Sequence, residues 1–479
     1  MIELVRANLA PMMFGGLVVF MLIGYPAAFS LSAVGLFFGI AALQLGLIEP
    51  GFLGNLSFQL YGVLSNDLLL AVPFFTLMGV ILERSGLAED LLEGFGQLFG
   101  GIRGGLSYAV IFVGAIMGAI TGTVAASVIS MGLISLPVMM RYNYNVRHAT
   151  GVIAASGTIA QLIPPSLVLI VLASQLGVSA GAMYVGATGA SIVQVLLFAA
   201  WVLLLSVLRP SQLPALPPEA RTLRGRALAI KLFRAMVPSL ALIFVVLGTI
   251  FLGLVTPTEA GAMGVVGATI LAAFNRRLSW AMMWQGMVAT TRLTAMVIFI
   301  LLGSRVFSLV FQGVGGSHWI ESMLVSLPGG QVGFLFFTMA FIFVMAFFLD
   351  FFEIAFIIIP LLTPAAQALH IDLVWFGIMV CATLQTSFMH PPFGFALFYL
   401  RGIAPRNVKT RDIYLGAIPW LLLQLVLVVI LIFFPELVTT FLSPASTTDL
   451  STIQITLPPD QNGDLSAPPT FDIAPPKFD

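Results

Sequence analysis

Two proline pairs interrupt apolar stretches of the chain, and their neighbours are the first residues that could do chemistry. One pair lies in "GTIAQLIPPSLVLIV" (Gly157–Val171) and the other in "LQTSFMHPPFGFALFYL" (Leu384–Leu400). Proline lacks the amide hydrogen that a helix interior needs, so each pair predicts a helix that is broken at the depth of a membrane. The loose amides and carbonyls at such a break are costly in hydrocarbon, and they can instead bind a carboxylate or a cation.

Hydroxyl-bearing and small residues surround both breaks. Ser156, Gly157 and Thr158 precede the first pair, and "ITGT" upstream adds Thr121, Gly122 and Thr123. Such uncharged, oxygen-rich surroundings suit a sodium ion. A simple packing kink is the alternative for either break alone, but two breaks at matching positions favour a binding function. The second break offers Gln385, Thr386, Ser387, His390 and Gly394.

Two carboxylates, Asp350 and Glu353, lie within another apolar stretch. A carboxylate at membrane depth is expensive and indicates a functional site, although Asp350 could equally cap a helix that starts there. His390 could titrate, or it could be a hydrogen-bonded structural group. Glu259 more simply caps a helix or pins a loop, and the single cysteine, Cys381, is interpreted as a packing residue.

The composition is typical of a protein that is embedded in a lipid bilayer. Of its residues 59% are hydrophobic and only 8% are charged, whereas soluble proteins carry about a quarter charged residues. The formal net charge of zero gives no indication of a nucleic-acid partner. The sequence contains no GxxxxGK[ST] phosphate loop, and no HExxH or paired-cysteine metal pattern. ATP-driven transport by this chain alone is therefore not expected.

About ten segments are long and apolar enough to cross a membrane. Two further segments, 104–140 and 333–372, are about twice the length of one span, and each is predicted to be a re-entrant hairpin, with tips near Gly122 and Asp350 respectively. The predicted crossings are 8–24, 27–47, 66–83, 148–175, 183–208, 236–254, 258–275, 292–313, 373–400 and 412–435.

The predicted elements occur twice in the same order: three spans, a hairpin, a broken span and a final span. "GYPAAFSLSAVG" in the first half corresponds to "VTPTEAGAMGVVG" in the second. Because each half has an odd number of crossings, the halves must be inverted, which is a design of secondary transporters. A basic, proline-rich linker, 208–238, joins them and predicts a cytoplasmic loop with a surface helix near 224–236. Both ends of the chain then face outward, and the proline-rich tail 443–479 is predicted to be disordered.

Four ordered motifs resemble the large membrane subunit of tripartite ATP-independent periplasmic (TRAP) transporters, the DctM-type permease. They are "ITGTVAASVISMGLISLPVMMRY", "GVIAASGTIAQLIPPSLVLIVLASQLG", "GLVTPTEAGAMG" and "LQTSFMHPPFGFALFYLRG". The resemblance covers about residues 8–440. It implies an all-α, multi-pass protein of the bacterial inner membrane that imports an organic acid by an elevator mechanism, coupled to sodium and without another cofactor.

The resemblance also implies partners and residue roles. A periplasmic solute-binding protein would deliver the substrate, and a small DctQ-like membrane subunit would stiffen the scaffold. The chain begins almost directly with its first span, which predicts that this small subunit is a separate protein. Two departures stand out: "TGTV" replaces the serine-rich "SGSS" of many members, and His390 replaces a threonine, which raises the possibility of proton involvement. The implied sodium-binding residues are Thr121, Gly122, Thr123, Gly157, Thr158, Gln385, Thr386, Ser387 and His390. The substrate-binding candidates are Gln161, Ser166, Asp350, Glu353 and Gly394.

The resemblance divides the chain into scaffold and transport segments. The predicted scaffold comprises 1–103, 183–332 with the linker, and 403–442, and the predicted transport domain comprises 104–182 and 333–402. Two alternatives stay open. The chain could be a stand-alone sodium- or proton-coupled dicarboxylate transporter, or a membrane-embedded enzyme using Asp350 and Glu353 as a carboxylate pair, although no second catalytic motif accompanies them.

Overall fold

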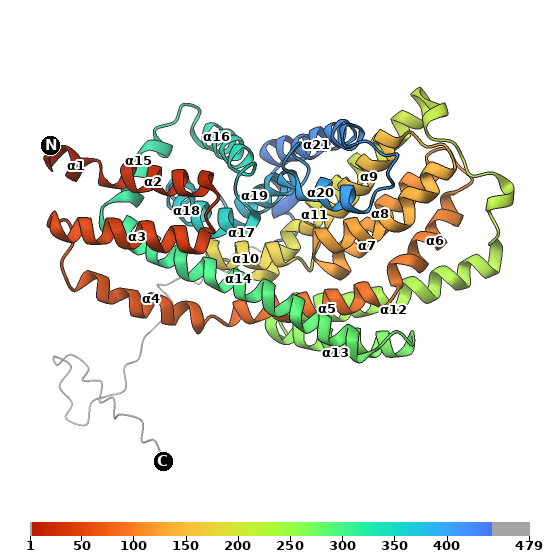
Figure 1. The fold of residues 1–479 in the computed structure, drawn as a ribbon, viewed down its shortest axis with the longest axis horizontal. Coiled ribbons are helices and arrows are strands. Elements are labelled where there is room, and N and C mark those ends of the chain that lie inside the picture. The colour runs from red at the N-terminus through yellow and green to blue at the C-terminus, as the bar shows by residue number, and fades with distance from the viewer. Residues whose placement is uncertain (1, 443–479) are drawn as a thin grey trace, which may run out of the picture. The chain divides into compact units, whose positions relative to one another are not determined.

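The computed structural model describes residues 2–442, and every regular element in this part of the chain is helical (Figure 1). The predicted disordered tail, 443–479, lies outside the described residues. Eight helices are long and apolar enough to cross a membrane, or up to ten if each of two bent helix pairs is one span. The expected all-α, multi-pass architecture is thus confirmed.

The first half of the chain contains eleven α-helices. They are α1 (Ile2–Ala7), α2 (Leu9–Ile23), α3 (Ala27–Gln44), α4 (Asn55–Leu64), α5 (Asp67–Arg84), α6 (Leu87–Phe99), α7 (Gly105–Thr121), α8 (Val124–Arg141), α9 (Val146–Thr158), α10 (Leu167–Leu176) and α11 (Ala180–Leu208). A short 3-10 turn, η1 (Phe52–Gly54), precedes α4, and another, η2 (Ile159–Gln161), follows α9.

The second half repeats this order after a linker with two more 3-10 turns, η3 (Pro210–Gln212) and η4 (Pro218–Ala220). Its helices are α12 (Gly225–Phe251), α13 (Pro257–Phe274), α14 (Trp280–Gly313), α15 (Gly316–Val325), α16 (Gly330–Met345), α17 (Phe351–Glu353), the π-helical η5 (Ile354–Ile358), α18 (Ile359–Ala368), α19 (Leu373–Ser387), α20 (Phe395–Ile403), α21 (Thr410–Phe433) and α22 (Glu436–Thr439).

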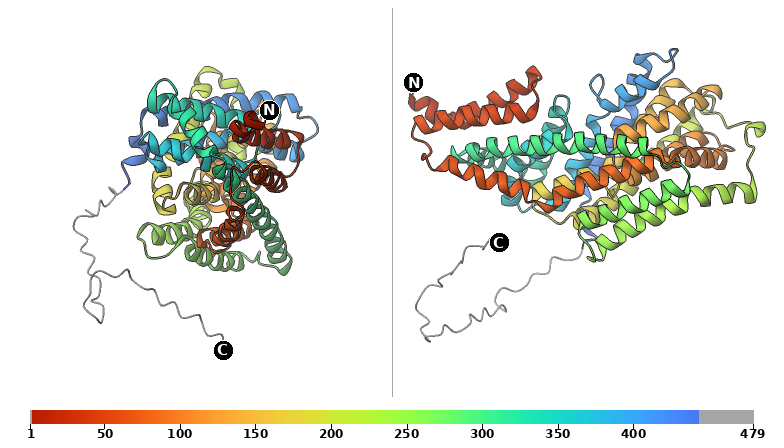
Figure 2. Two further views of the ribbon diagram at one scale, coloured as in Figure 1. Left: turned by 90° about the vertical axis from the view of Figure 1, so that its left-hand side faces the viewer. Right: turned by 60° about the horizontal axis from the view of Figure 1, so that its bottom comes forward.

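Two pairs of helices join the two halves of the chain. α3 of the first half packs along α14 of the second, and α13 of the second packs along α5 of the first, as Figure 1 shows. Glycines allow the first contact, since a Cβ on Gly303 would lie 2.5 Å from the carbonyl oxygen of Ala28. The second contact includes a hydrogen bond of 2.6 Å from the Thr258 hydroxyl to the carbonyl oxygen of Asp67. α12 and α13 lie side by side, which the right-hand view of Figure 2 shows.

Two predicted spans start earlier in the structure than expected, and a third is preceded by a further helix. The helix predicted at 236–254 is α12, which starts at Gly225 and includes the expected surface helix. The helix predicted at 292–313 is α14, which starts at Trp280. Arg292 and the basic residues of α12 lower the local hydropathy, but they do not interrupt helical hydrogen bonding. The span predicted at 66–83 is α5, and α4 precedes it at an angle of 43°.

Two short helices, α6 and α15, were not expected from the sequence. Each lies directly before a hairpin, and at 13 and 10 residues they are too short to register as crossings. α15 and the first limb of its hairpin, α16, meet at an angle of 118°. The chain therefore turns sharply before it enters this hairpin.

Both hairpins and both broken helices have their predicted places. α7 and α8 form the first hairpin, and α16 with α17, η5 and α18 forms the second. α9 is separated from α10, and α19 from α20, by segments that contain the proline pairs, and the Pro164–Pro165 and Pro391–Pro392 bonds are both cis. α11 and α21, the last long helices of each half, pack on the broken helices.

Candidate functional site

The tip of the first hairpin lies beside the first proline pair. α7 ends at Thr121, Gly122 has a φ of +59°, and α8 begins at Val124. A Cβ on Gly122 would lie 3.6 Å from the carbonyl oxygen of Pro165. Thr123 is the residue before α8. The structure thus brings the predicted hairpin tip and the first break together, while the Thr121 side chain lies outside the part that the structure describes.

Close contacts hold the two limbs of this hairpin on α9 and on η2, the turn that follows α9. A Cβ on Gly118 of α7 would lie 2.9 Å from the Cα of Ala160. A Cβ on Gly157 of α9 would lie 2.3 Å from Cγ2 of Val128 on α8. Since real Cβ atoms do not approach so closely, both positions require glycine for packing. Gly157 contributes only its backbone to any site here.

Thr158 is the centre of a buried polar cluster that joins the two halves. Its Oγ1 donates to the carbonyl oxygen of Ala155 at 2.8 Å and accepts from Gln424 Nε2 at 2.8 Å and from Gln385 Nε2 at 3.4 Å. Thr158, Gln385 and Gln424 are fully buried. A hydroxyl has one donor and two acceptor positions, so all three are used. The first broken helix is thereby linked to the second and to α21.

Three glutamine carbonyls near the breaks have no hydrogen-bond donor among the described residues. They are Oε1 of Gln161, of Gln385 and of Gln424, and the buried Ser156 Oγ has no partner either. Buried polar atoms almost always have partners, so unpaired oxygens around a helix break fit a hard cation or water. No cluster of three or more histidine, cysteine, aspartate or glutamate residues that could hold a metal occurs in residues 2–442. A cation here would therefore depend on uncharged oxygens.

Ser166 and Gln161 shape the turn of the first break. Ser166 Oγ accepts from the amide of Val168 at 3.2 Å and so caps α10. The same hydroxyl donates to the carbonyl oxygen of Gln161 at 2.5 Å. Cys381 Sγ of α19 also donates to this carbonyl, at 3.4 Å. The second broken helix is therefore in direct contact with the turn of the first.

The hydroxyls at the second break bond to their own helix. Thr386 Oγ1 donates to the carbonyl oxygen of Thr383 at 2.6 Å, and Ser387 Oγ donates to that of Leu384 at 2.7 Å. Their lone pairs can still accept a donor or ligate a cation. Gly394 precedes α20 at a tight turn, where a Cβ would lie 2.5 Å from the carbonyl oxygen of Phe388.

His390 is enclosed by aromatic rings of the second hairpin. Its ring is stacked on Phe347 with centroids 4.1 Å apart, and it meets Phe343 edge-on at 4.2 Å. The side chain is fully buried, and neither ring nitrogen has a hydrogen-bond partner among the described residues. The structure thus packs this predicted sodium ligand against two phenyl rings and gives its ring nitrogens no hydrogen-bond partner among the described residues.

Asp350 and Glu353 form a reciprocal capping box at the tip of the second hairpin. Asp350 Oδ1 accepts from the Glu353 amide at 2.8 Å, and Glu353 Oε2 accepts from the Asp350 amide at 2.9 Å. The capping alternative for Asp350 is therefore what the structure contains. Both residues line a cavity of about 530 Å³ whose other walls come from the start of α3 and from α14. No hydrogen bond of the described residues links them to the Thr158 cluster.

Two buried glutamines were not expected from the sequence. Gln424 is in the middle of α21, and Gln194 occupies the comparable place in α11. Both amide atoms of Gln194 are buried without a partner in residues 2–442. The sequence does contain an indication of both glutamines, which lie within the apolar runs "WLLLQLVLVV" and "SIVQVLLF". A glutamine in such a run is costly in a membrane and indicates an internal contact.

The part of the chain that is similar to known proteins contains the hairpins and the broken helices. The family model described as "Tripartite ATP-independent periplasmic transporter, DctM component" matches residues 14–437, which contain both hairpins and both breaks. The chain belongs to this family. It is therefore a large permease subunit of a TRAP transporter, a multi-pass protein of the bacterial inner membrane. Because this is a family of transport permeases, it lends no support to the membrane-enzyme alternative.

Individual relatives agree with this membership, and one solved structure is similar in fold. The chain is 27% identical to the C4-dicarboxylate TRAP transporter large permease DctM of Rhodobacter capsulatus, over 89% of this chain and 97% of the relative. It is 29% identical to the DctM of Pseudomonas aeruginosa, over 82% of this chain and 90% of the relative. The structure of the Alcanivorax borkumensis YdaH transporter matches with a TM-score of 0.59 at 15% identity, covering 81% of this chain and 90% of that one, and shows likeness of fold alone.

Proposed function

We propose that this DctM-family permease imports an organic acid coupled to sodium, by an elevator movement of its hairpins and broken helices. The observation that carries the proposal is the Thr158 cluster. It links the two broken helices and leaves buried glutamine oxygens free beside the first break. An ion bound there would contact both repeats at once, and the coupling-ion sites of inverted-repeat transporters lie at the interface between the repeats.

The sodium sites are proposed at the two breaks. Because the Thr158 hydroxyl is already used, we assign it a positioning role and expect Oε1 of Gln385 and of Gln161 to act as ligands together with nearby backbone carbonyls. The Gly122–Thr123 tip belongs to the first site, and Thr386 and Ser387 belong to the second. The side chain of His390, which offers no oxygen and contacts two phenyl rings, is proposed to hold the second break against the second hairpin.

The substrate is proposed to bind its carboxylate at the starts of the helices that follow the breaks. The amides at the start of α10, next to Ser166, and those at the start of α20, after Gly394, can donate to an anion. The relatives named above carry C4-dicarboxylate in their names, which supports an organic acid. Asp350 and Glu353 would repel such an anion, and we propose that they fix the hairpin tip.

The moving unit is proposed to comprise both hairpins, both broken helices, α11 and α21. The sequence-based division placed α11 and α21 in the scaffold, but their packing on α9 and α19 and the Gln424–Thr158 bond favour movement with the broken helices. The cavity between the second hairpin tip and the α3–α14 pair lies at the proposed boundary of this moving unit.

A small DctQ-like membrane subunit and a periplasmic solute-binding protein are proposed as partners, in line with the family. The test is uptake by proteoliposomes that contain the permease and its small subunit. A panel of labelled carboxylates would be offered with and without the binding protein, under a sodium gradient or a proton gradient. Uptake that needs both sodium and the binding protein supports the proposal. Uptake without the binding protein supports the stand-alone alternative, and uptake driven by protons alone contradicts sodium coupling.

A further inference from the structure

A polar cavity of about 240 Å³ lies where the starts of α9 and α21 meet the end of α11. Two arginines, Arg147 of α9 and Arg209 at the end of α11, contribute to its wall together with Trp201, Gln212 and Trp420. It is distinct from the Thr158 cluster and from the cavity at Asp350, because none of its lining residues belongs to either.

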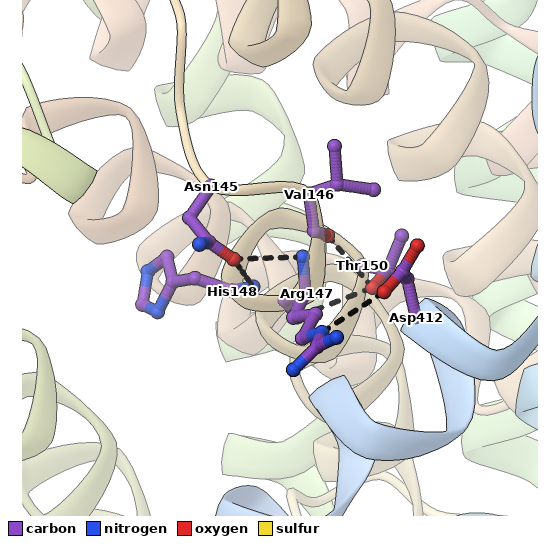
Figure 3. Close-up of polar contacts among 6 residues, drawn as sticks. All are labelled: Asn145, Val146, Arg147, His148, Thr150 and Asp412. Carbon is purple, nitrogen blue, oxygen red and sulfur yellow. Dashed lines mark hydrogen bonds and ion pairs between the residues drawn. The ribbon is translucent and has the colours of Figure 1, made fainter. Parts of the chain in front are cut away.

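Hydrogen bonds and one ion pair hold the walls of this cavity together. Arg147 Nε donates to Asp412 Oδ1 of α21 at 2.9 Å, which Figure 3 shows. The amide of Asn145, the residue before α9, donates to the carbonyl oxygen of Gln212 at 3.0 Å, so the loop after α11 is held against α9. Asn145 Oδ1 in turn accepts from the amides of Arg147 and His148, at 3.0 and 3.3 Å.

The cavity has one positive charge in excess. Asp412 offsets Arg147, whereas the guanidinium of Arg209 forms no hydrogen bond or ion pair with another residue in the described range 2–442. His148 is buried, and its Nε2 is 2.8 Å from Ser107 Oγ. An unpaired arginine beside a polar cavity matches a phosphate group, whose oxygens accept two parallel hydrogen bonds from the guanidinium fork.

The outer face of α11 indicates that this phosphate belongs to a lipid. Leu204, Val207 and Leu208 are exposed on the last turns of this apolar helix, directly before Arg209. Acyl chains could lie along these leucines and the valine while the head group enters the cavity. Trp201, half-buried in its wall, suits the boundary between hydrocarbon and head groups. Basic pockets between membrane helices are known to bind acidic lipid head groups.

We propose that the cavity at the ends of α9, α11 and α21 binds the phosphate of an acidic phospholipid, with Arg209 as its principal ligand. The bound lipid would connect the first broken helix with α11 and α21. Acidic lipid should therefore stabilise the unit that contains both helix breaks, whatever substrate the permease carries.

The test uses delipidated, purified full-length permease in detergent. Its melting temperature is measured against increasing phosphatidylglycerol, with phosphatidylcholine and inorganic phosphate as separate additions. Arg209→Gln is compared with wild type and with Arg226→Gln, a matched change at an exposed arginine outside the cavity. Should Arg209→Gln not fold, Arg209→Lys keeps the charge and loses the planar fork.

We expect phosphatidylglycerol to raise the melting temperature of wild type and of Arg226→Gln with the same half-saturating concentration. Arg209→Gln should need at least five times more lipid, and Arg209→Lys should lie between. Equal titrations for wild type and the Arg209 variants would overturn the proposal. So would an equal effect of phosphatidylcholine, which would remove the preference for acidic lipid, or of inorganic phosphate alone, which would make the ligand a soluble anion.

Discussion

The side-chain amide of Gln424 donates to the hydroxyl of Thr158 across 2.8 Å and so joins α21 to the last residue of α9. Gln385 of the second broken helix donates to the same hydroxyl. One threonine thus holds two glutamines from the other half of the chain. The last residue of α9 is thereby held at the point where the regular hydrogen bonding of this helix ends.

Replacing Gln424 by leucine should destabilise the permease by about 1–3 kcal/mol, because the Thr158 hydroxyl loses its shorter donor in a buried place. The matched control is Gln194→Leu in α11, whose amide has no partner among the described residues, so this change should be neutral or slightly stabilising. Thermal unfolding in detergent measures both. Equal losses in the two variants would show that the Gln424–Thr158 bond contributes nothing of its own.

Gly157→Ala should destabilise the contact between α9 and α8 by about 1–3 kcal/mol, because its Cβ would collide with Val128. Adding Val128→Ala should recover part of this loss. Gly248→Ala in α12, where no atom lies within 4 Å of the new Cβ, should instead raise stability by about 0.5–1 kcal/mol. The same melting experiment reports all three. A double variant no more stable than Gly157→Ala alone would argue against the proposed collision.

Asp350→Asn should retain both stability and transport, because asparagine caps a helix as well as aspartate does. Asp350→Ala should lose about 0.5–2 kcal/mol, since the Glu353 amide then has no acceptor. Uptake and melting temperature are measured for both variants in parallel. Loss of transport in a stable Asp350→Asn protein would mean that the negative charge itself is needed, and would restore a direct role for this carboxylate.

Much of this arrangement could be predicted from local sequence because it depends on local backbone chemistry. The proline pairs can only break a helix, and Gly122 among weak helix formers predicted the first hairpin tip. Asp350, followed three residues later by Glu353, is a capping-box pattern that the structure contains.

Other features depend on contacts that no local pattern contains. Gln424 meets Thr158 only because α21 packs across α9, 266 residues away along the chain. His390 packs against Phe343 of α16 and against Phe347, which follows this helix, and the residues next to His390 do not indicate these contacts. Hydropathy predicts a start of α14 at 292, later than the observed Trp280, because it detects the lipid-facing part of a helix and not its polar end.

The most direct test of the account is the sodium dependence of uptake in proteoliposomes with wild type, Gln385→Leu and Gln312→Leu. Gln312 is an exposed glutamine at the end of α14 and serves as the matched control. With substrate and binding protein saturating, Gln385→Leu should raise the sodium concentration for half-maximal uptake about tenfold, equivalent to roughly 1.4 kcal/mol of lost binding. Gln312→Leu should match wild type. A sodium dependence that Gln385→Leu leaves unchanged would contradict a sodium site between the two broken helices.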